Sequence, residues 1–307
     1  MDGCNAVDKS TFGIGRWGVE KRVKNLKQME EKVMEILFLL SAGVSVAAVI
    51  LICLFLFANG LPAIRQIGVF SFLFGKRWKP ANGLYGILPM IVGSFYVTAG
   101  ALVTGVPVGV LTAVFLARFC PKQIYKPLKA AVNLMAGIPS VVYGFFGLVV
   151  LVPSVRETFG GRGMSVLTAS GLLGLMILPT VISVSEASIR AVPESYYEGG
   201  LALGASHERS VFYTVIPAAK SGIFASVVLG IGRAVGETMA VMMVAGNQAV
   251  IPRNVLSGVR TLTTNIVLEM GYATDLHREA LIGTAVVLFV FILLINLSLS
   301  LFKRKVR

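Results

Sequence analysis

The stretch Glu198-Gly199-Gly200-Leu201-Ala202-Leu203-Gly204, followed after nine residues by Thr214-Val215-Ile216-Pro217, forms a polar island between strongly apolar segments. Sixteen residues beyond Pro217, Arg233 and Glu237 interrupt sequence that otherwise has the composition of a membrane span. A short soluble segment between two spans predicts a docking surface, and charges inside a span predict a path for a charged solute. Together they predict a transporter that is driven by a separate partner.

The composition is that of an all-α integral membrane protein. The 307 residues are 55% hydrophobic and only 14% charged, and the mean hydropathy is +0.80, which is far from the composition of a soluble domain. A helix needs about 20 mostly apolar residues to cross a bilayer. Five charge-free intervals are long enough, and a sixth qualifies if the membrane tolerates Arg233 and Glu237. The six expected spans cover residues 36–64, 80–117, 130–155, 163–185, 221–252 and 280–302.

The distribution of Lys and Arg predicts the orientation. Six spans place 18 basic residues on one side of the membrane and nine on the other. The positive-inside rule then places both termini and the 186–220 loop in the cytoplasm. The expected organisation is a polar, amphipathic segment over 1–32, a membrane domain over 33–302 and a basic tail over 303–307. The net charge of +13 thus indicates contact with anionic membrane lipid rather than with nucleic acid.

The first span does not resemble a cleaved signal peptide. Its apolar run is too long, and a 32-residue polar segment precedes it. In the loop after the first span, we expect Phe70, Phe74 and Trp78 to lie at the membrane interface, where aromatic rings settle.

Neither the cysteines nor the histidines predict a metal or a cofactor. Cys4, Cys53 and Cys120 are scattered without ligand spacing, and His207 and His277 are isolated. No Gly-x-x-x-x-Gly-Lys-Ser/Thr loop occurs, so the chain is not expected to be an enzyme that hydrolyses nucleotides itself.

The 186–220 loop predicts a compact helical hairpin. Residues 194–203 are compatible with a helix, Gly204 can end it, and residues 206–215 make a second short helix. Ser206 is the expected N-cap of this second helix. Glycine suits the joint because it adopts positive φ without steric cost.

The spacing of this loop resembles the EAA loop of ABC-transporter permeases, Glu-Ala-Ala-x-x-x-Gly-x9-Ile-x-Leu-Pro. Glu198, Gly204 and Pro217 match, whereas Gly199-Gly200 replaces the two alanines, and Thr214 and Ile216 replace isoleucine and leucine. The resemblance implies that the loop couples to an ATPase. The implied coupling residues are Glu198, Gly199, Gly200, Gly204 and Pro217.

Further strings resemble the phosphate-transport permeases of the PstC type. The most discriminating is Gly236-Glu237-Thr238-Met239-Ala240, because the companion PstA-type permeases tend to read Gly-Glu-Thr-Ala-Pro there. The other strings are Phe72-Leu73-Phe74-Gly75, Trp78-Lys79-Pro80, Gly86-Ile87-Leu88-Pro89, Ala136 to Gly144, Gly232 to Val235, Arg260-Thr261-Leu262-Thr263 and Glu269-Met270-Gly271-Tyr272.

This similarity implies a six-helix permease with the type I importer fold in the prokaryotic plasma (inner) membrane, which carries inorganic phosphate. It also implies three partners: a second permease of the PstA type, a cytoplasmic ATPase dimer of the PstB type and an external phosphate-binding protein of the PstS type.

Arg233, Glu237 and Thr238 are the candidate residues of the substrate path. At positions i and i+4, Arg233 and Glu237 are expected to pair on one helix face. Arg offers a planar fork for phosphate oxygens, and Glu237 tempers the attraction; the alternative is a purely structural ion pair.

Other functions remain open on the sequence. An ABC permease for sulfate, molybdate or an amino acid has the same architecture. A proton-coupled secondary transporter would use Arg233 and Glu237 without ATP. A membrane enzyme has little support, because no nucleophile-base or metal constellation appears in the sequence.

Overall fold

The computed structural model describes the backbone of residues 11–305 and the side chains of residues 31–298. It divides into two compact units, Met1–Phe55 and Leu56–Arg307. Within the described residues, six helical segments are long and apolar enough to cross a membrane, so the predicted number is confirmed. These are Glu31–Ile67, Leu88–Phe119, Ser140–Phe159, Val166–Arg190, His207–Gly236 and Asp275–Ser298.

Helix α1 (Thr11–Ile67) contains the first of these segments. From Val33 to Phe55 its large apolar side chains are mostly exposed within the chain. The predicted amphipathic segment over 1–32 has its first ten residues outside the described part, and residues 11–32 continue the same helix. Residues 306–307 of the predicted basic tail also lie outside it, while α13 (Asp275–Lys305) includes 303–305.

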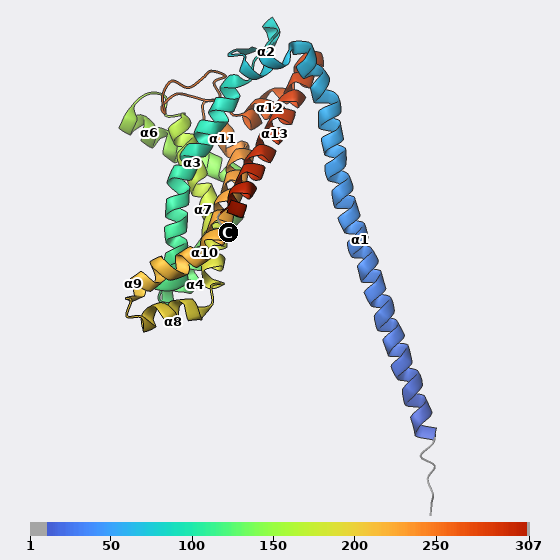
Figure 1. Ribbon diagram of the computed structural model, residues 1–307. Coiled ribbons are helices and arrows are strands. Elements are labelled where there is room, and N and C mark those ends of the chain that lie inside the picture. The colour runs from blue at the N-terminus through green and yellow to red at the C-terminus, as the bar shows by residue number, and fades with distance from the viewer. Residues whose placement is uncertain (1–10, 306–307) are drawn as a thin grey trace, which may run out of the picture. The chain divides into compact units, whose positions relative to one another are not determined.

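The second unit is built around α7 (Val166–Arg190), the most deeply buried of the six segments. Helices α3 (Leu88–Val114) and α10 (Ile216–Gly236) pack along it. Figure 1 shows α3 along one side of the bundle, next to α7. Around them lie α4 (Lys122–Gly137), α5 (Ser140–Phe146), α6 (Val152–Phe159), α11 (Met239–Val244), α12 (Leu262–Met270) and α13.

Small residues allow α3 and α7 to approach closely. A Cβ at Gly105 would lie 2.7 Å from the carbonyl oxygen of Gly174, and a Cβ at Gly109 would lie 2.8 Å from Val181. Between α7 and α10, the hydroxyls of Ser185 and Ser226 form a buried hydrogen bond of 2.7 Å. Close backbone approach and interhelical hydrogen bonds hold membrane helices together, because lipid supplies no hydrophobic driving force between them.

One end of the second unit is closed by a small cap. It contains α2 (Val69–Phe74), a two-residue antiparallel hairpin of β1 (Trp78–Lys79) and β2 (Leu84–Tyr85), and the 3₁₀ turn η1 (Pro80–Asn82) between them. The prediction that the second span begins at residue 80 is therefore wrong, because Pro80 and Gly83, with a φ of 69°, form the turn of this hairpin. The span begins at Leu88.

The three aromatic residues expected at the membrane interface differ in exposure. Phe70 and Phe74 are 80% and 61% exposed, and their rings stack with centroids 6.2 Å apart. Trp78, however, is buried within the cap. Its indole N–H donates a hydrogen bond to the carboxylate of Glu269, 191 positions along the chain.

Two other spans were predicted with wrong boundaries. The interval 130–155 includes the end of α4 and a break at Ile138-Pro139, because proline disfavours helical backbone in the residue before it. The interval 221–252 ends too late, since α10 stops at Gly236 and is followed by the short α11 and a loop. It also begins too late, because the helical segment starts at His207.

Three π-helical segments interrupt the described helices, each ending two residues before a proline. They are η2 (Phe115–Phe119), η3 (Gly147–Leu151) and η4 (Val211–Val215), followed by Pro121, Pro153 and Pro217. Proline lacks an N–H and clashes with the carbonyl four residues earlier. The wider π turn accommodates both defects, so η4 lets the helix pass Pro217 without a break.

Candidate functional site

The polar island folds as the predicted helical hairpin, here called the knob (residues 194–215). Helix α8 (Glu194–Ala202) ends before Gly204, whose φ of 82° makes the turn. The side chain of Ser206 accepts a hydrogen bond from the backbone N–H of Arg209 and caps α9 (His207–Ser210). Both local predictions are confirmed. The second helix, however, is not separate, because it continues through η4 into α10.

Large apolar side chains gather on the exposed surface of the knob. Leu203 is 91% exposed and Tyr213 is 79% exposed, which is unusual for residues of their size. Smaller exposed fractions are found at Tyr196, Phe212 and Leu201. Among the motif residues, Glu198, Gly199, Gly204 and Pro217 are exposed, whereas Gly200 lies against Ser210. This surface therefore suits a protein partner.

An ion cluster around one buried carboxylate lies beside the knob, here called the Glu186 cluster (Tyr125, Lys129, Glu186 and Arg190). The carboxylate of Glu186, on α7, accepts hydrogen bonds from Tyr125 Oη at 2.7 Å, Lys129 Nζ at 2.7 Å and Arg190 Nε at 2.9 Å. The hydrogen bond to Glu186, together with burial, raises the pKa of Tyr125. Sequence reasoning missed this cluster, although a lone acid near the end of a span was a signal.

The expected pairing of Arg233 with Glu237 is wrong. Helix α10 ends at Gly236, and Glu237 has an extended backbone with a ψ of 127°. Its carboxylate accepts the backbone N–H of Ala240 at 3.2 Å, and Thr263 Oγ1 donates to its carbonyl at 3.3 Å. The side chains of Arg233 and Glu237, both within the described residues, form no ion pair, because the helix that would align them stops between them.

The three candidate path residues nevertheless remain in one region of the bundle. Arg233 is exposed on the last turn of α10, and Glu237 and Thr238 are partly buried just beyond it. Glu237 lines a narrow crevice with Ser94 and Thr98 of α3. The arrangement places a free cation on the surface of the chain and a carboxylate with hydroxyl groups inside it.

At the capped end, side chains from the hairpin, the loop before α12, α12 and α13 converge, here called the cap cluster (Trp78, Arg260, Glu269 and His277). The Glu269 carboxylate accepts hydrogen bonds from Arg260 Nη1 at 2.6 Å, Trp78 Nε1 at 2.8 Å and His277 Nε2 at 2.9 Å. Burial alone would raise the pKa of Glu269, but these three hydrogen bonds outweigh it and hold the pKa below its ordinary value. The sequence prediction assigned no role to this cluster.

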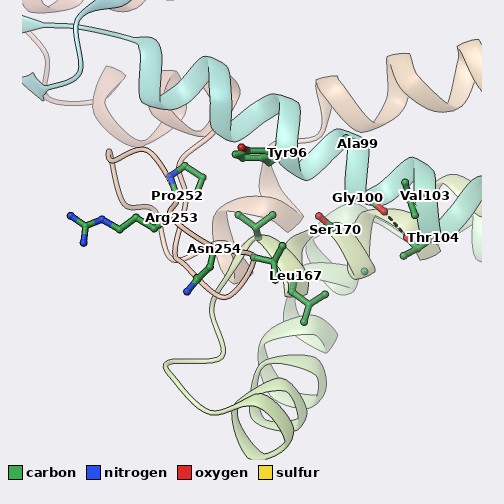
Figure 2. Close-up of a pocket in the computed structure, with 13 residues that line it drawn as sticks. Tyr96, Ala99, Gly100, Val103, Thr104, Leu167, Ser170, Pro252, Arg253 and Asn254 are labelled. Atoms are coloured by element: carbon green, nitrogen blue, oxygen red, sulfur yellow. Dashed lines mark hydrogen bonds between the residues drawn. The ribbon is translucent and has the colours of Figure 1, made fainter.

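A groove of about 520 Å³ opens between α3, the start of α7 and the loop before α12. Tyr96, Val103 and Leu167 make it largely apolar, and Figure 2 shows Arg253 extending away from it. None of the three path residues lines this groove. Among the side chains that the structure describes, no three His, Cys, Asp or Glu residues gather to hold a metal ion.

The family model and the relatives that match this chain all describe transport permeases. Residues 105–307 match the family model described as the binding-protein-dependent transport system inner membrane component. A Bacillus subtilis protein named as the probable ABC transporter permease YqgH is 38% identical over 91% of this chain and 94% of its own length. The phosphate transport system permease protein PstC of Mesorhizobium japonicum is 34% identical over 78% of this chain and 80% of its own.

Solved structures show the same fold. A chain of the MetNI methionine ABC transporter in an inward-facing conformation superposes with a TM-score of 0.57, covering 75% of this chain and 100% of that one at 20% identity. The resemblance to PstC-type permeases and the six-helix architecture are thereby confirmed. The chain belongs to the family of binding-protein-dependent transport system inner membrane components, and it is a multi-pass inner membrane protein with the fold of an ABC transporter permease.

Proposed function

We propose that this chain is a transmembrane permease subunit of an ATP-driven importer of inorganic phosphate. The observation that carries the proposal is the similarity to proteins named as PstC phosphate permeases, at 34% identity over most of the chain. The Gly236 to Ala240 string and the exposed Arg233 support phosphate as the cargo.

The knob is the proposed docking surface for a cytoplasmic ATPase dimer. Its exposed Leu203 and Tyr213 offer the apolar anchors that protein interfaces use. Glu198, Gly199, Gly200, Gly204 and Pro217 shape this coupling loop. With the knob in the cytoplasm, the rest of the 186–220 region lies there too, as do both chain ends and the polar segment over 1–32. The cap then faces outward, towards an external phosphate-binding protein.

Arg233, Glu237 and Thr238 are the proposed substrate path. An exposed Arg at the end of a membrane-length helix is costly in lipid, so a second permease that covers it would complete a polar path. Its guanidinium can bind two phosphate oxygens at once. Glu237, held by the N–H of Ala240, adds negative charge nearby, which favours release of the anion over tight binding.

The test is reconstitution with the two permeases, the ATPase and the external binding protein in proteoliposomes. ATP-dependent uptake of labelled phosphate supports the proposal. Uptake of sulfate or molybdate in its place would indicate another oxyanion permease. Transport by this polypeptide alone, driven by a proton gradient without ATP, would indicate a secondary transporter and contradict the proposal.

A further inference from the structure

The Glu186 cluster joins α4 to α7 and to the end of α3. Apart from Val132, no side chain of α4 is fully buried. Tyr125 and Lys129 are its polar contacts with α7, and both bind the carboxylate of Glu186. That carboxylate is almost completely buried, with a side-chain exposure of 3%. Helix α4 is therefore held on the bundle by the packing of Val132 against Leu116 and Ile182 and by hydrogen bonds to one buried carboxylate.

The same cluster also reaches the end of α3. Arg190, whose Nε donates to Glu186, uses its Nη2 to donate to the carbonyl oxygen of Leu116 at 2.8 Å. Leu116 belongs to the π segment η2, where the widened turn frees carbonyl groups from regular helical bonding. The Arg190 guanidinium also stacks over the Tyr125 ring at 4.6 Å, so α3, α4 and α7 meet at one point.

From η2 the contacts continue into the knob. Arg118 Nη1 forms an ion pair of 2.9 Å with Glu194, the first residue of α8, and its guanidinium lies 5.8 Å from the Tyr197 ring centroid. Phe119 packs against His207 with ring centroids 4.7 Å apart. The hydroxyl of Tyr197 and Nδ1 of His207 are 2.8 Å apart and link the two helices of the knob. Figure 1 shows α4, α8 and α9 gathered at this end of the bundle.

The charges make Glu186 the critical member. One buried carboxylate neutralises two cations, Lys129 and Arg190. Losing the anion removes the attraction that holds the two cations together and leaves only the repulsion between them. Neutralising Glu186 would leave two neighbouring cations with no anion between them, so α4 and the Arg190 side chain would move apart.

We infer that Glu186 is a positioning residue for coupling: through Arg190 and η2 it ties the knob to α3, and through Tyr125 and Lys129 it ties the knob to α4. When a partner moves the knob, both helices follow because the contacts are continuous. This inference rests on the proposed function, in which an ATPase moves the knob.

The test compares the complete transporter containing Glu186→Gln with the unaltered complex. The variant is expected to assemble and to hydrolyse ATP within about twofold of the unaltered rate, while phosphate imported per ATP falls at least about fivefold. Lys126→Gln on the same helix serves as the matched control, because Lys126 is exposed and lies outside the cluster. The double variant Glu186→Gln/Lys129→Gln removes one uncompensated cation. It is expected to recover part of the lost phosphate import per ATP hydrolysed.

A distance measurement tests whether Glu186 links the knob to α4, without any measurement of transport. Spin labels at Tyr213→Cys on the knob and Leu134→Cys on α4, both exposed sites, are placed in a chain whose Cys4, Cys53 and Cys120 are replaced by Ser. Glu186→Gln is expected to broaden the distance distribution and Lys126→Gln to leave it unchanged.

Each outcome bears on the inference. If uptake and hydrolysis fall in the same proportion, or the distances stay unchanged, Glu186 is merely structural and the inference is overturned. If Glu186→Gln does not assemble, Arg118→Gln cuts the same chain of contacts nearer the knob and must show the same loss of coupling. If the unaltered complex imports no phosphate, the proposed function fails, while the distance measurement still decides whether the tie exists.

Discussion

Arg260 and Glu269 form an ion pair of 2.6 Å in which both side chains are more than four-fifths buried. Arg260 also donates through Nε to the carbonyl oxygen of Asn247 at 3.0 Å. Trp78 and His277 complete the partners of the Glu269 carboxylate. This one acid thus fastens the hairpin, α12 and the start of α13 to the loop that follows α11.

Replacing Glu269 with Gln should destabilise the cap, because it leaves Arg260 buried without an anion. The expected loss is about 3 kcal/mol at neutral pH, measured as a lower thermal midpoint in detergent. The folded-state pKa of Glu269 lies below its ordinary value, so its stabilisation is present above the unfolded pKa and is lost as the pH falls through the folded pKa. The difference between variant and parent should therefore shrink as the pH falls below about 4.

Glu279→Gln is the control for this experiment, since Glu279 is exposed on α13. It should change the midpoint little at either pH. A Glu269→Gln protein as stable as its parent at neutral pH would show that the cap cluster contributes nothing to the fold.

Replacing Arg233 with Gln should reduce phosphate uptake by about tenfold or more, because a hydrogen bond to a charged group contributes roughly 1.5–3 kcal/mol. Arg233→Lys keeps the charge but loses the planar fork, so an intermediate rate is expected. Uptake is measured in the reconstituted complex after its assembly is confirmed. Arg253→Gln, at the rim of the apolar groove, is the control; full transport by Arg233→Gln would exclude Arg233 from the path.

Replacing Leu203 with Glu should weaken ATPase binding by about tenfold or more, since loss of a central apolar anchor typically costs over 1 kcal/mol. The side chain is 91% exposed, so the fold itself should be unaffected. Co-purification and titration of the ATPase provide the measurement. Leu203→Met keeps an apolar side chain and should bind normally. Equal affinity of both variants would remove Leu203 from the interface.

Two glycines of the knob should respond to alanine in opposite directions. Gly204 has a φ of 82°, where a Cβ costs about 1–2 kcal/mol, so Gly204→Ala should loosen the turn. Gly199 lies in the interior of α8 with open space around it, and Gly199→Ala should strengthen that helix by up to about 1 kcal/mol. Hydrogen exchange of the backbone amides over 194–210 should rise in the first variant and fall in the second.

The features that the sequence predicted correctly are local. The Gly204 turn and the Ser206 cap depend on residues at most three positions away, and the number of spans depends on apolar runs. The same local rules failed at Gly236, where the pattern of apolar residues continues although the helix stops. There, Thr263 from a later segment holds the carbonyl of Glu237, which no spacing within the span reveals.

The cap cluster and the Glu186 cluster, which the sequence did not predict, are formed by side chains that lie far apart in the sequence. Trp78 and Glu269 are separated by 191 positions, and Tyr125 and Glu186 by 61. Nothing in the sequence around Trp78 indicates that its indole is buried against Glu269. The acids themselves were visible as isolated charges in apolar surroundings, but their partners became identifiable only when the helices were packed.

The unbroken helical segment from His207 to Gly236 converts a rotation of the knob into a displacement of Arg233. Its 30 residues carry a docking segment at one end and Arg233 near the other, at a separation of about 40 Å. A tilt of about 5° about the knob would sweep Arg233 sideways by about 3 Å, the length of a hydrogen bond. A small rotation of the knob is thus sufficient to make or break contact between Arg233 and an anion.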